Sequence, residues 1–284
     1  LDIRVIRVIR GLFVVEFRAR RLYFPTMFPR CKRFFMIKFV CAVVVIAGLT
    51  MSASAQTLAE RVLASYDPVQ SVNCQIRKDS ESGGKTMRML SRVYYEKPDR
   101  LHVDQPAPIP RRIVADGKTF YSYIEGDPRG FSRPIEKLNE EMQINLRKVP
   151  GTAMDHLMKL KGVAETNLEA TAEFPERKGY DTGKLFVVLS MDATGRLARI
   201  EFFSSPEMKE TTLQCDYSDF QLVAGSAWIP CLHQSALRIG GVESKETTRV
   251  DNLSVNQAIP ASLFVAGPFF KDVEFVDSFD AVYK

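Results

Sequence analysis

The amino-acid sequence predicts a mainly β protein built on one large antiparallel sheet. About ten or eleven stretches alternate polar with apolar residues at hairpin spacing, which argues for a sheet curled into a barrel or half-barrel. Turn signals such as Asp116-Gly117 and Gly240-Gly241 separate these stretches. A segment of about 28 residues beginning at Pro134 changes to helical periodicity. The predicted fold is therefore a curled sheet with a short helical insertion.

Basic residues are concentrated at the N-terminus. The chain has 284 residues, 45% of them hydrophobic and 26% charged, as in ordinary globular proteins. Residues 1–35 carry nine Lys/Arg and two Asp/Glu, and residues 36–55 add only Lys38. Residues 56–284 therefore hold 29 basic and 32 acidic residues, a formal charge of −3. This balance does not predict a nucleic-acid-binding surface.

Residues 36–55 have the pattern of a secretory signal peptide. Lys38 provides the positive n-region, an apolar run follows, and Ala53-Ser54-Ala55 is a small-residue cleavage site. The apolar run is short for a membrane span. Cys41 lies inside this run without the small residues of a lipoprotein box before it. We therefore expect a cleaved signal and a soluble exported protein, with residues 56–284 as a single domain.

Residues 1–35 have more than one interpretation. Arginines spread through an apolar background fit either a very long n-region or a start site assigned too early, with Met36 as the true initiator. We favour the second interpretation and leave this segment out of fold reasoning. A basic amphipathic helix at a membrane surface is the third option, for which Arg4, Arg7 and Arg10 have helical spacing.

A short helix is expected to open the exported part of the chain. Thr57 and Glu60 have the spacing of a capping box, in which each side chain satisfies a free N–H group of the first turn. Apolar residues follow at helical spacing, and Pro68 ends the helix.

The strands that follow have one apolar face. Residues 69–78 form the first strand, and Gly83-Gly84 turns the chain into the second. In the second strand, apolar and charged residues alternate, which marks a sheet with one dry and one wet face. The apolar set is Met87, Met89, Val93 and Tyr95, and Leu101 and Val103 continue it beyond Pro98.

The helical insertion is predicted in two parts. Pro134 suits the first helical position, and Ile135, Leu138, Met142 and Leu146 would then form one stripe. After Pro150-Gly151, the spacing of Thr152 and Asp155 suggests a second N-cap, followed by apolar residues that include Leu157 and Met158.

Strands resume in the C-terminal half. Residues 184–190 and 197–203 are expected to form a hairpin, residues 211–220 a strand, and residues 228–239 and 242–250 a last hairpin. The exported part has three cysteines, an odd number that does not make a disulfide framework. Two options remain open: a Cys215–Cys231 bridge between paired strands, or buried free thiols together with Cys74.

The sequence contains no convincing catalytic or metal-binding pattern. Gly117-Lys118-Thr119 imitates the end of a phosphate loop, but the glycine required five residues earlier is Arg112. Cys231 and His233 share a strand face that Cys215 could approach, yet no zinc-type spacing accompanies them. We therefore expect no enzyme activity, no cofactor and no metal.

Flexible apolar side chains gather on the dry sheet face and on the insertion. Methionine fills irregular spaces and adapts to varied ligands, and a concave sheet under a helical lid is a geometry that can hold an apolar cavity. The same side chains would equally serve as a closed core. The candidates for lining a cavity are Met87, Met89, Val93, Tyr95 and Val103 on the sheet and Leu138, Met142, Leu157 and Met158 on the lid.

The meander from Val93 to Tyr123 resembles the periplasmic outer-membrane lipoprotein carrier (LolA-like) family. The phrases that carry the resemblance are Glu96-Lys97-Pro98-Asp99-Arg100-Leu101, Gln105-Pro106 and Val114-Ala115-Asp116-Gly117-Lys118-Thr119 with Tyr123. An opening helix, a helical insertion and the late segment from Asp251 to Phe264 are also similar. The resemblance implies a curled, unclosed antiparallel barrel covered by short helices, located in the periplasm.

The resemblance also implies a function and two site residues. A LolA-like protein would carry the acyl chains of lipoproteins or other lipids as a monomer, from an inner-membrane lipoprotein-release transporter to an outer-membrane acceptor. Lys97 takes the position of an arginine that closes the lid in the family, although lysine lacks the guanidinium fork. Leu101 takes the position of an aromatic residue at the cavity mouth. The alternatives are a sensing or scaffold module of the cell envelope and, less supported, a lipid hydrolase.

Overall fold

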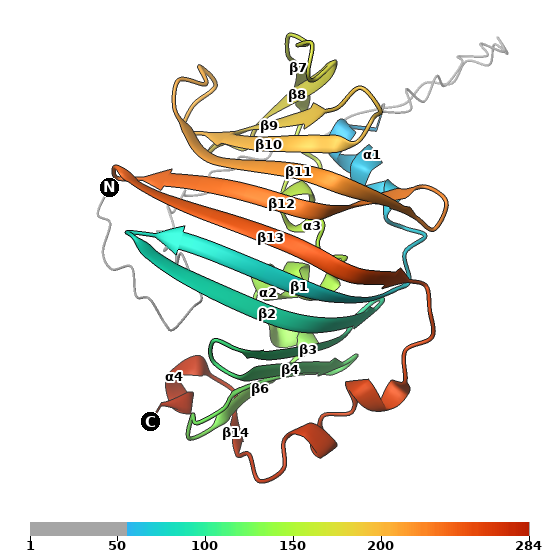
Figure 1. Ribbon diagram of the computed structural model, residues 1–284, viewed down its shortest axis with the longest axis vertical. Helices are drawn as coiled ribbons and strands as arrows, with labels where there is room; N and C mark the ends of the chain where they lie inside the picture. Colours follow the sequence, from blue (N-terminus) through green and yellow to red (C-terminus); the bar gives the residue numbers. More distant parts are fainter. Residues whose placement is uncertain (1–55, 284) are drawn as a thin grey trace, which may run out of the picture. The chain divides into compact units, whose positions relative to one another are not determined.

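The strands of the described region pair into one continuous sheet. The computed structural model describes residues 56–283. The strands are β1 (Ser71–Ser82), β2 (Lys85–Glu96), β3 (Arg100–Ala107), β4 (Arg111–Asp116), β5 (Thr119–Ile124), β6 (Gly130–Pro134), β7 (Glu165–Asn167), β8 (Glu176–Asp181), β9 (Phe186–Met191), β10 (Leu197–Phe203), β11 (Thr211–Val223), β12 (Ala227–Ile239), β13 (Val242–Val255) and β14 (Phe275–Val276). Their order across the sheet is β14-β6-β5-β4-β3-β2-β1-β13-β12-β11-β10-β9-β8-β7, with β14 and β7 at the two edges (Figure 1). The predicted mainly β fold with a curled, unclosed sheet is confirmed.

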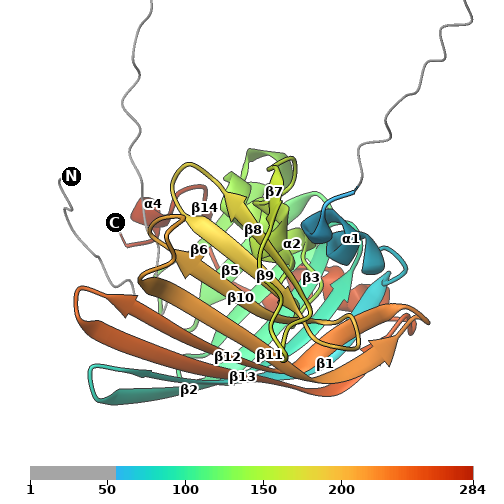
Figure 2. The same ribbon diagram turned by 90° about the horizontal axis from the view of Figure 1, so that it is seen from above.

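Helices lie on the concave side of this sheet, and a C-terminal segment follows its outer side. Figure 2 shows the sheet curving around α1 and α2. The helical elements are α1 (Leu58–Ser65), η1 (Ile135–Lys137), α2 (Glu140–Arg147), α3 (Met154–Met158), η2 (Ala261–Phe264), η3 (Gly267–Phe269) and α4 (Phe279–Val282), where η marks a single 3-10 turn.

The capping box predicted for α1 is present. Glu60 N donates to Thr57 Oγ1 at 3.3 Å, and Thr57 N donates to Glu60 Oε2 at 3.0 Å. Leu58, Ala59 and Val62 are buried on one face of the helix. The helix is fixed to β8 because the Ala59 N–H donates to the Tyr180 hydroxyl at 3.0 Å.

The predicted hairpin turns are also present. In the β4–β5 hairpin the two loop residues are Gly117 and Lys118, one residue later than the predicted Asp116-Gly117. In the β4–β5 turn the residue with positive φ is Gly117, at +95°. Asp116 holds the turn through its side chain, which accepts from Lys118 N and Thr119 N at 2.8 Å each. Gly240 and Gly241 both have positive φ between β12 and β13, which suits a tight two-residue turn.

The helical insertion differs from the prediction. Residues 130–134 form strand β6, and the stripe from Ile135 to Leu146 is broken into η1 and α2. The break occurs because Asn139 caps a new helix, its side chain accepting from Met142 N at 2.8 Å. Thr152 does not cap α3; its hydroxyl donates to the Val149 carbonyl oxygen at 2.7 Å. The second predicted N-cap was therefore wrong.

The sheet has more strands than the predicted ten or eleven. Residues 56–283 contribute 14 strands to it. The strands that the sequence did not indicate are β6, β7, β8 and β14, of which β14 pairs in parallel with β6. These strands are short, and β8 is mostly polar, so alternation does not distinguish them from loops.

Two apolar clusters hold the helices to the sheet. The larger cluster joins α1 and α3 to the central and C-terminal strands, and Leu157, Tyr180 and Ile200 are fully buried in it. The smaller cluster packs Leu138 and Leu146 against Phe120 and Phe131 of β5 and β6. The helical insertion therefore divides its apolar side chains between two cores.

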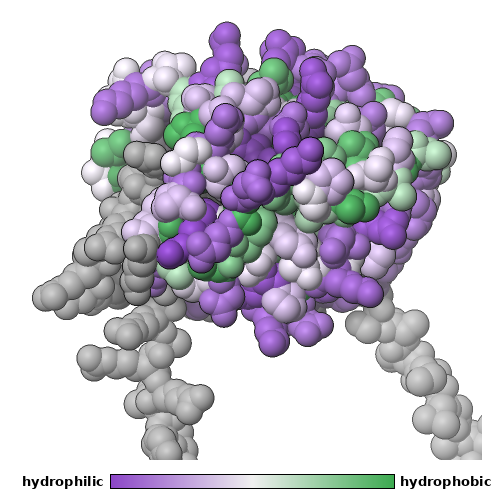
Figure 3. Space-filling view, turned by 90° about the horizontal axis from the view of Figure 1, so that it is seen from below, coloured by the Kyte–Doolittle hydropathy of each residue, from purple (hydrophilic) through white to green (hydrophobic). Residues whose placement is uncertain are grey.

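Residues 257–270 cover part of the outer face of the meander, whereas Val282 of α4 packs into the smaller apolar cluster. His102 of β3 points to this side, where its Nδ1 donates to the Leu263 carbonyl oxygen at 2.7 Å and its ring meets Phe269 at 4.6 Å. His102 is consequently buried on the face that alternation marks as wet. Seen from this end, the surface has small hydrophobic patches among hydrophilic residues (Figure 3).

Some sequence expectations lie outside the described residues. These are the signal peptide at 36–55 and all three interpretations of residues 1–35: a long n-region, a start at Met36, and a basic amphipathic helix. Within residues 56–283, none of the helices has both the length and the apolar character needed to cross a membrane.

Candidate functional site

A cavity of about 450 Å³ lies between the concave face of the sheet and the segment that joins α2 to α3. Its sheet wall comes from β1, β2, β3, β11, β12 and β13. The lining residues are Ile76, Lys78, Met89, Ser91, Val93, Leu101, Val103, Gln105, Asn145, Lys148, Pro150, Gly151, Thr152, Asp155, His156, Leu213, Cys215, Tyr217, His233, Ser235, Glu246, Thr248 and Val250. This is the volume of a small-molecule site.

One part of the sheet wall is mainly apolar. Neighbouring strands β1, β2 and β3 contribute Ile76, Met89, Val93, Leu101 and Val103 to it, beside the polar Lys78, Ser91 and Gln105. These side chains share one face because the strands pair in register, with Val93 opposite Val103 and Tyr95 opposite Leu101. A hydrocarbon chain lying on this wall would be removed from water.

The adjoining part of the sheet wall, from β13 to β11, is mainly polar. Tyr217 of β11 and His233 of β12 are directly paired in the sheet, and their rings stack with centroids 4.7 Å apart and an interplanar angle of 16°. Lys78 Nζ and Glu246 Oε1 form an ion pair of 2.9 Å on β1 and β13. Burial lowers the pKa of His233 to about 4, so its ring is neutral at pH 7.

The lid side is also polar. Lys148 Nζ lies 3.3 Å from Asp155 Oδ2, and this ion pair helps to keep the pKa of Asp155 low against the effect of burial. His156 stands beside it with a pKa lowered by burial. The four charged groups of the cavity therefore form two neutral pairs, Lys78–Glu246 and Lys148–Asp155.

The structure brings four of the predicted lining residues into the cavity and leaves the others outside it. Met89, Val93, Leu101 and Val103 line the apolar wall. The remaining candidates do not: Met87 is 39% exposed near the β1–β2 turn, Tyr95 and Leu157 are fully buried, Leu138 and Met142 belong to the smaller core, and Met158 packs on the larger core. The lid residues that do reach the cavity are polar because α2 and α3 turn their apolar sides to the cores.

Lys97 contacts the end of α1 and not α2 or α3. Its Nζ donates to the carbonyl oxygens of Tyr66 at 2.9 Å and Asp67 at 3.2 Å. The sheet is instead tied to α2 by the neighbouring Asp99, whose Oδ1 accepts from Arg147 Nε at 2.7 Å. The Tyr95 hydroxyl adds a second tie, donating to the Arg147 carbonyl oxygen at 2.8 Å.

Apolar residues continue the concave face beyond the cavity toward the tips of two adjacent hairpins. β1 and β13 pair as far as Ser82 and Ser244, so the β1–β2 and β12–β13 hairpins project together (Figure 2). Ile239 is 60% exposed and Val242 54% exposed at the β12–β13 tip. These two cross-strand partners form an exposed apolar pair, which we call the mouth strip; Met87 lies on the same concave face but is separated from them by Ser80, Ser82 and Ser244.

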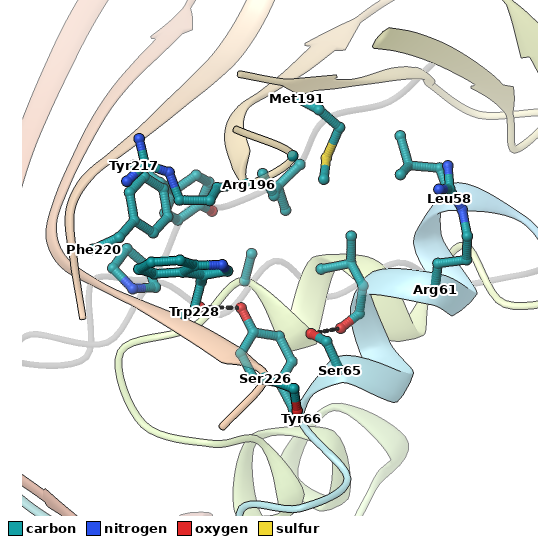
Figure 4. A pocket seen from close by; sticks show the side chains of 15 residues that line it. Leu58, Arg61, Ser65, Tyr66, Met191, Arg196, Tyr217, Phe220, Ser226 and Trp228 are labelled. Carbon is teal, nitrogen blue, oxygen red and sulfur yellow. Dashed lines mark hydrogen bonds between the residues drawn. The ribbon is translucent and has the colours of Figure 1, made fainter. Parts of the chain in front are cut away.

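A second, smaller cavity of about 250 Å³ lies between α1 and strands β9 to β12. Figure 4 shows Leu58 and Arg61 of α1 facing Phe220, Trp228 and Arg196 across it. The Arg196 guanidinium is paired with Asp192 at 2.7 Å and lies over the rings of Phe220, at 4.6 Å, and Trp228, at 5.5 Å. Its charge is therefore already compensated.

The cysteines do not form a bridge or a reactive site. Cys74, Cys215 and Cys231 are free, and although β11 and β12 pair, Cys215 lies opposite Ser235. Burial raises the pKa of the Cys215 thiol to about 12, which keeps it protonated. Within residues 56–283, no group of three or more His, Cys, Asp or Glu residues has the arrangement of a metal site.

Solved structures provide the comparison for this fold. The chain is similar to a DUF1329 family protein from Desulfovibrio piger, with 12% identity, a TM-score of 0.49 and coverage of 73% of this chain and 94% of the other. It is also similar to a LolA superfamily protein from Nitrosomonas europaea, with 12% identity, a TM-score of 0.47 and coverage of 73% and 97%. A third structure, a domain from Vibrio parahaemolyticus assigned to outer membrane lipoprotein sorting, has 10% identity, a TM-score of 0.48 and coverage of 73% and 94%.

At TM-scores below 0.5 and identities of 10–12%, these likenesses do not assign the chain to a family or a role. No protein-family profile and no curated protein matches the sequence.

The polar wall was missed by sequence reasoning. His233, Glu246 and Thr248 alternate with other polar residues, so their strands show no dry face. A usable signal was the predicted length of the last hairpin, which the structure extends further, to strands of 13 and 14 residues. Their concave positions must then contribute to any cavity.

Proposed function

We propose that this protein binds a fatty-acyl chain of a lipoprotein or another lipid in the cavity between the sheet and the α2–α3 segment, and carries it through the periplasm. The observation that carries the proposal is the apolar wall of β1, β2 and β3 under a polar lid. Each buried methylene contributes about 0.8 kcal/mol. A chain can therefore bind without a specific polar contact and be passed on to an acceptor.

The mouth strip supports an entry route. Ile239 and Val242 are each more than half exposed and lie opposite each other, so they present joined apolar surface at the hairpin tip. They lie on the same face of β12 and β13 as the cavity lining, so an acyl chain that leaves a membrane or a partner would meet them first and then reach the apolar wall of β1, β2 and β3. We propose this end as the side where an inner-membrane release transporter and an outer-membrane acceptor meet the protein.

The proposed function also assigns roles to the N-terminal segment, to the domain as a whole and to the residues that hold the helices. Residues 36–55 would export the chain, and residues 56–284 would act as a single monomeric domain. The thiol of Cys215 is protonated and the cavity charges are paired, which supports a binding role and not catalysis. Lys97 would fix α1 to the meander, and Asp99 would close the lid over the cavity.

The first test is binding of a synthetic lipopeptide that carries fatty-acyl chains, followed by native mass spectrometry before and after organic extraction. We expect a bound lipopeptide that extraction removes. Val103→Trp, which fills the apolar wall, should weaken binding by at least about tenfold, since one buried side chain is worth more than about 1.4 kcal/mol. The matched control is Arg92→Trp, which adds the same side chain at an exposed position of β2 and should leave binding unchanged.

Two outcomes would reject the carrier function. One is a protein of apo mass that takes up no added lipopeptide. The other is equal binding by the Val103→Trp and Arg92→Trp variants, which would place the lipid outside the cavity. A sensing or scaffold module that binds a protein partner would then be the better account.

The Asp99–Arg147 ion pair provides a second test, of lid closure. Asp99→Asn should speed release of the bound lipopeptide by about two- to fivefold, because a partly exposed ion pair is worth about 0.2–1 kcal/mol. Asp104→Asn is the control, since it breaks the Asp104–Arg112 pair of 2.9 Å on the same meander without touching α2. Release rates measured by stopped-flow fluorescence that are equal in both variants would contradict the lid role.

A further inference from the structure

Tyr217 lies between the two cavities. It is the one residue that contributes to the lining of both the cavity of about 450 Å³ and the cavity of about 250 Å³. Across from it, Thr152 lines the larger cavity and the adjacent Ala153 lines the smaller one. Tyr217 on the sheet side and the Thr152–Ala153 turn on the lid side therefore lie at the boundary between the cavities, as do Val250 and Pro230 beside Gly151.

The Tyr217 side chain is held weakly for a buried tyrosine. Its ring is 5% exposed, and its hydroxyl has no oxygen or nitrogen partner and only a weak contact with the Cys215 thiol. By contrast, the buried tyrosines Tyr95 and Tyr180 both donate through their hydroxyls, to Arg147 O and Glu165 Oε2. A rotation of Tyr217 would therefore break no hydrogen bond to oxygen or nitrogen, but would give up the stack on His233, the contact with the Cys215 thiol and packing at the edge of the larger core.

The smaller cavity is suited to hydrocarbon. Apolar side chains from α1 and from β9 to β12 surround it, including Leu58, Val62, Met191, Leu197 and Phe220. The Arg196 charge at its edge is paired with Asp192 and covered by aromatic rings. The Tyr66 hydroxyl donates a hydrogen bond to the Trp228 carbonyl oxygen at 3.1 Å (Figure 4). An apolar chain entering this space would leave none of these polar groups unpaired.

We propose that Tyr217 is a movable divider, and that the far end of a long acyl chain displaces it and extends into the cavity beside α1. This inference rests on the proposed function, because the chain must first occupy the larger cavity. It adds a second compartment and predicts that chain length, not only the presence of a chain, determines which cavities are filled.

Trp228 gives a direct measurement of occupancy. It is the single tryptophan of the chain, and it lines the smaller cavity and not the larger one. The probes are monoacylglycerols of increasing chain length with a bromine on the terminal carbon, which quenches tryptophan on contact. Binding itself is followed separately by native mass spectrometry of the full protein. Short chains should bind without quenching, and the longest should remove most of the Trp228 emission.

Two comparisons make the assignment specific. The same long monoacylglycerol with bromine next to the head group should bind equally well and leave Trp228 bright. In Tyr217→Ala, which removes the divider, quenching should begin at shorter chain lengths than in the wild-type protein. The wild-type measurement does not depend on any variant folding.

The outcomes separate the inference from the proposed function. Binding of the long terminally brominated lipid without quenching would overturn the divider and leave the carrier function standing. Quenching that does not depend on the position of bromine would also overturn it, since the chain would then not point toward α1. Absence of binding by every monoacylglycerol would reject both.

Discussion

Replacing Leu157 with alanine is expected to lower the free energy of unfolding by about 2–5 kcal/mol, because it removes a fully buried leucine from the larger core. Helix α3 has only five residues and no side-chain N-cap. A helix this short is not stable alone, so its position depends on packing. Leu157 is the side chain that anchors it.

The effect should reach the cavity as well as the core. Asp155 and His156, which directly precede the buried Leu157 in α3, line the cavity. Loss of the anchor should therefore weaken lipopeptide binding together with stability. Urea unfolding gives the first quantity and native mass spectrometry the second. Met158→Ala is the matched control, since the partly buried Met158 should cost less; equal losses in the two variants would show that α3 is not anchored through Leu157.

Alternation along the strands predicted the sheet well where one face was apolar. In β2 and β3 it identified Met89, Val93, Leu101 and Val103 as one surface, and these residues form the apolar wall. It failed in β12 and β13, because a polar cavity wall and a solvent-facing surface have the same composition. His233 and Glu246 therefore carried no signal of burial.

Helical periodicity was less informative than local capping. The apolar spacing from Ile135 to Leu146 continues across the break between η1 and α2. Leu138 is buried like the helical residues, although it lies outside both helices, just before the cap at Asn139. The apolar spacing reflects packing on the smaller core, not a single helix. The burial of His102 could not be predicted either, since it depends on Leu263 and Phe269, more than a hundred residues later in the chain.

Acidification from pH 6.5 to about 4 is expected to destabilise the protein, with His233 as a main contributor. Burial lowers the pKa of His233 to about 4, whereas an unfolded histidine has a pKa of about 6.5. Between these values the unfolded chain binds a proton that the folded protein does not, so the free energy of unfolding falls as the pH falls. The shift corresponds to a loss on the order of 3 kcal/mol across this window.

The surroundings of His233 explain the direction of the shift. Glu246 on β13 and Asp155 on α3 favour its protonation, while Lys78 on β1 and His156 on α3 oppose it, and burial outweighs all four. The pKa of His156 is also lowered by burial, so its contribution has the same sign. Carboxyl groups with lowered pKa values, such as Glu165, act in the same direction but at lower pH.

His233→Gln isolates the histidine contribution. Glutamine cannot titrate, and the buried Nε2 of His233 has no partner to lose, so stability at pH 7.5 should change little. Between pH 6.5 and about 4 the variant should lose markedly less stability than the wild-type protein, because one proton no longer couples to unfolding. Urea unfolding at a series of pH values measures both curves. Parallel curves would mean that His233 has the same pKa in the folded and unfolded states. Burial in the cavity wall would then not disfavour its charged form.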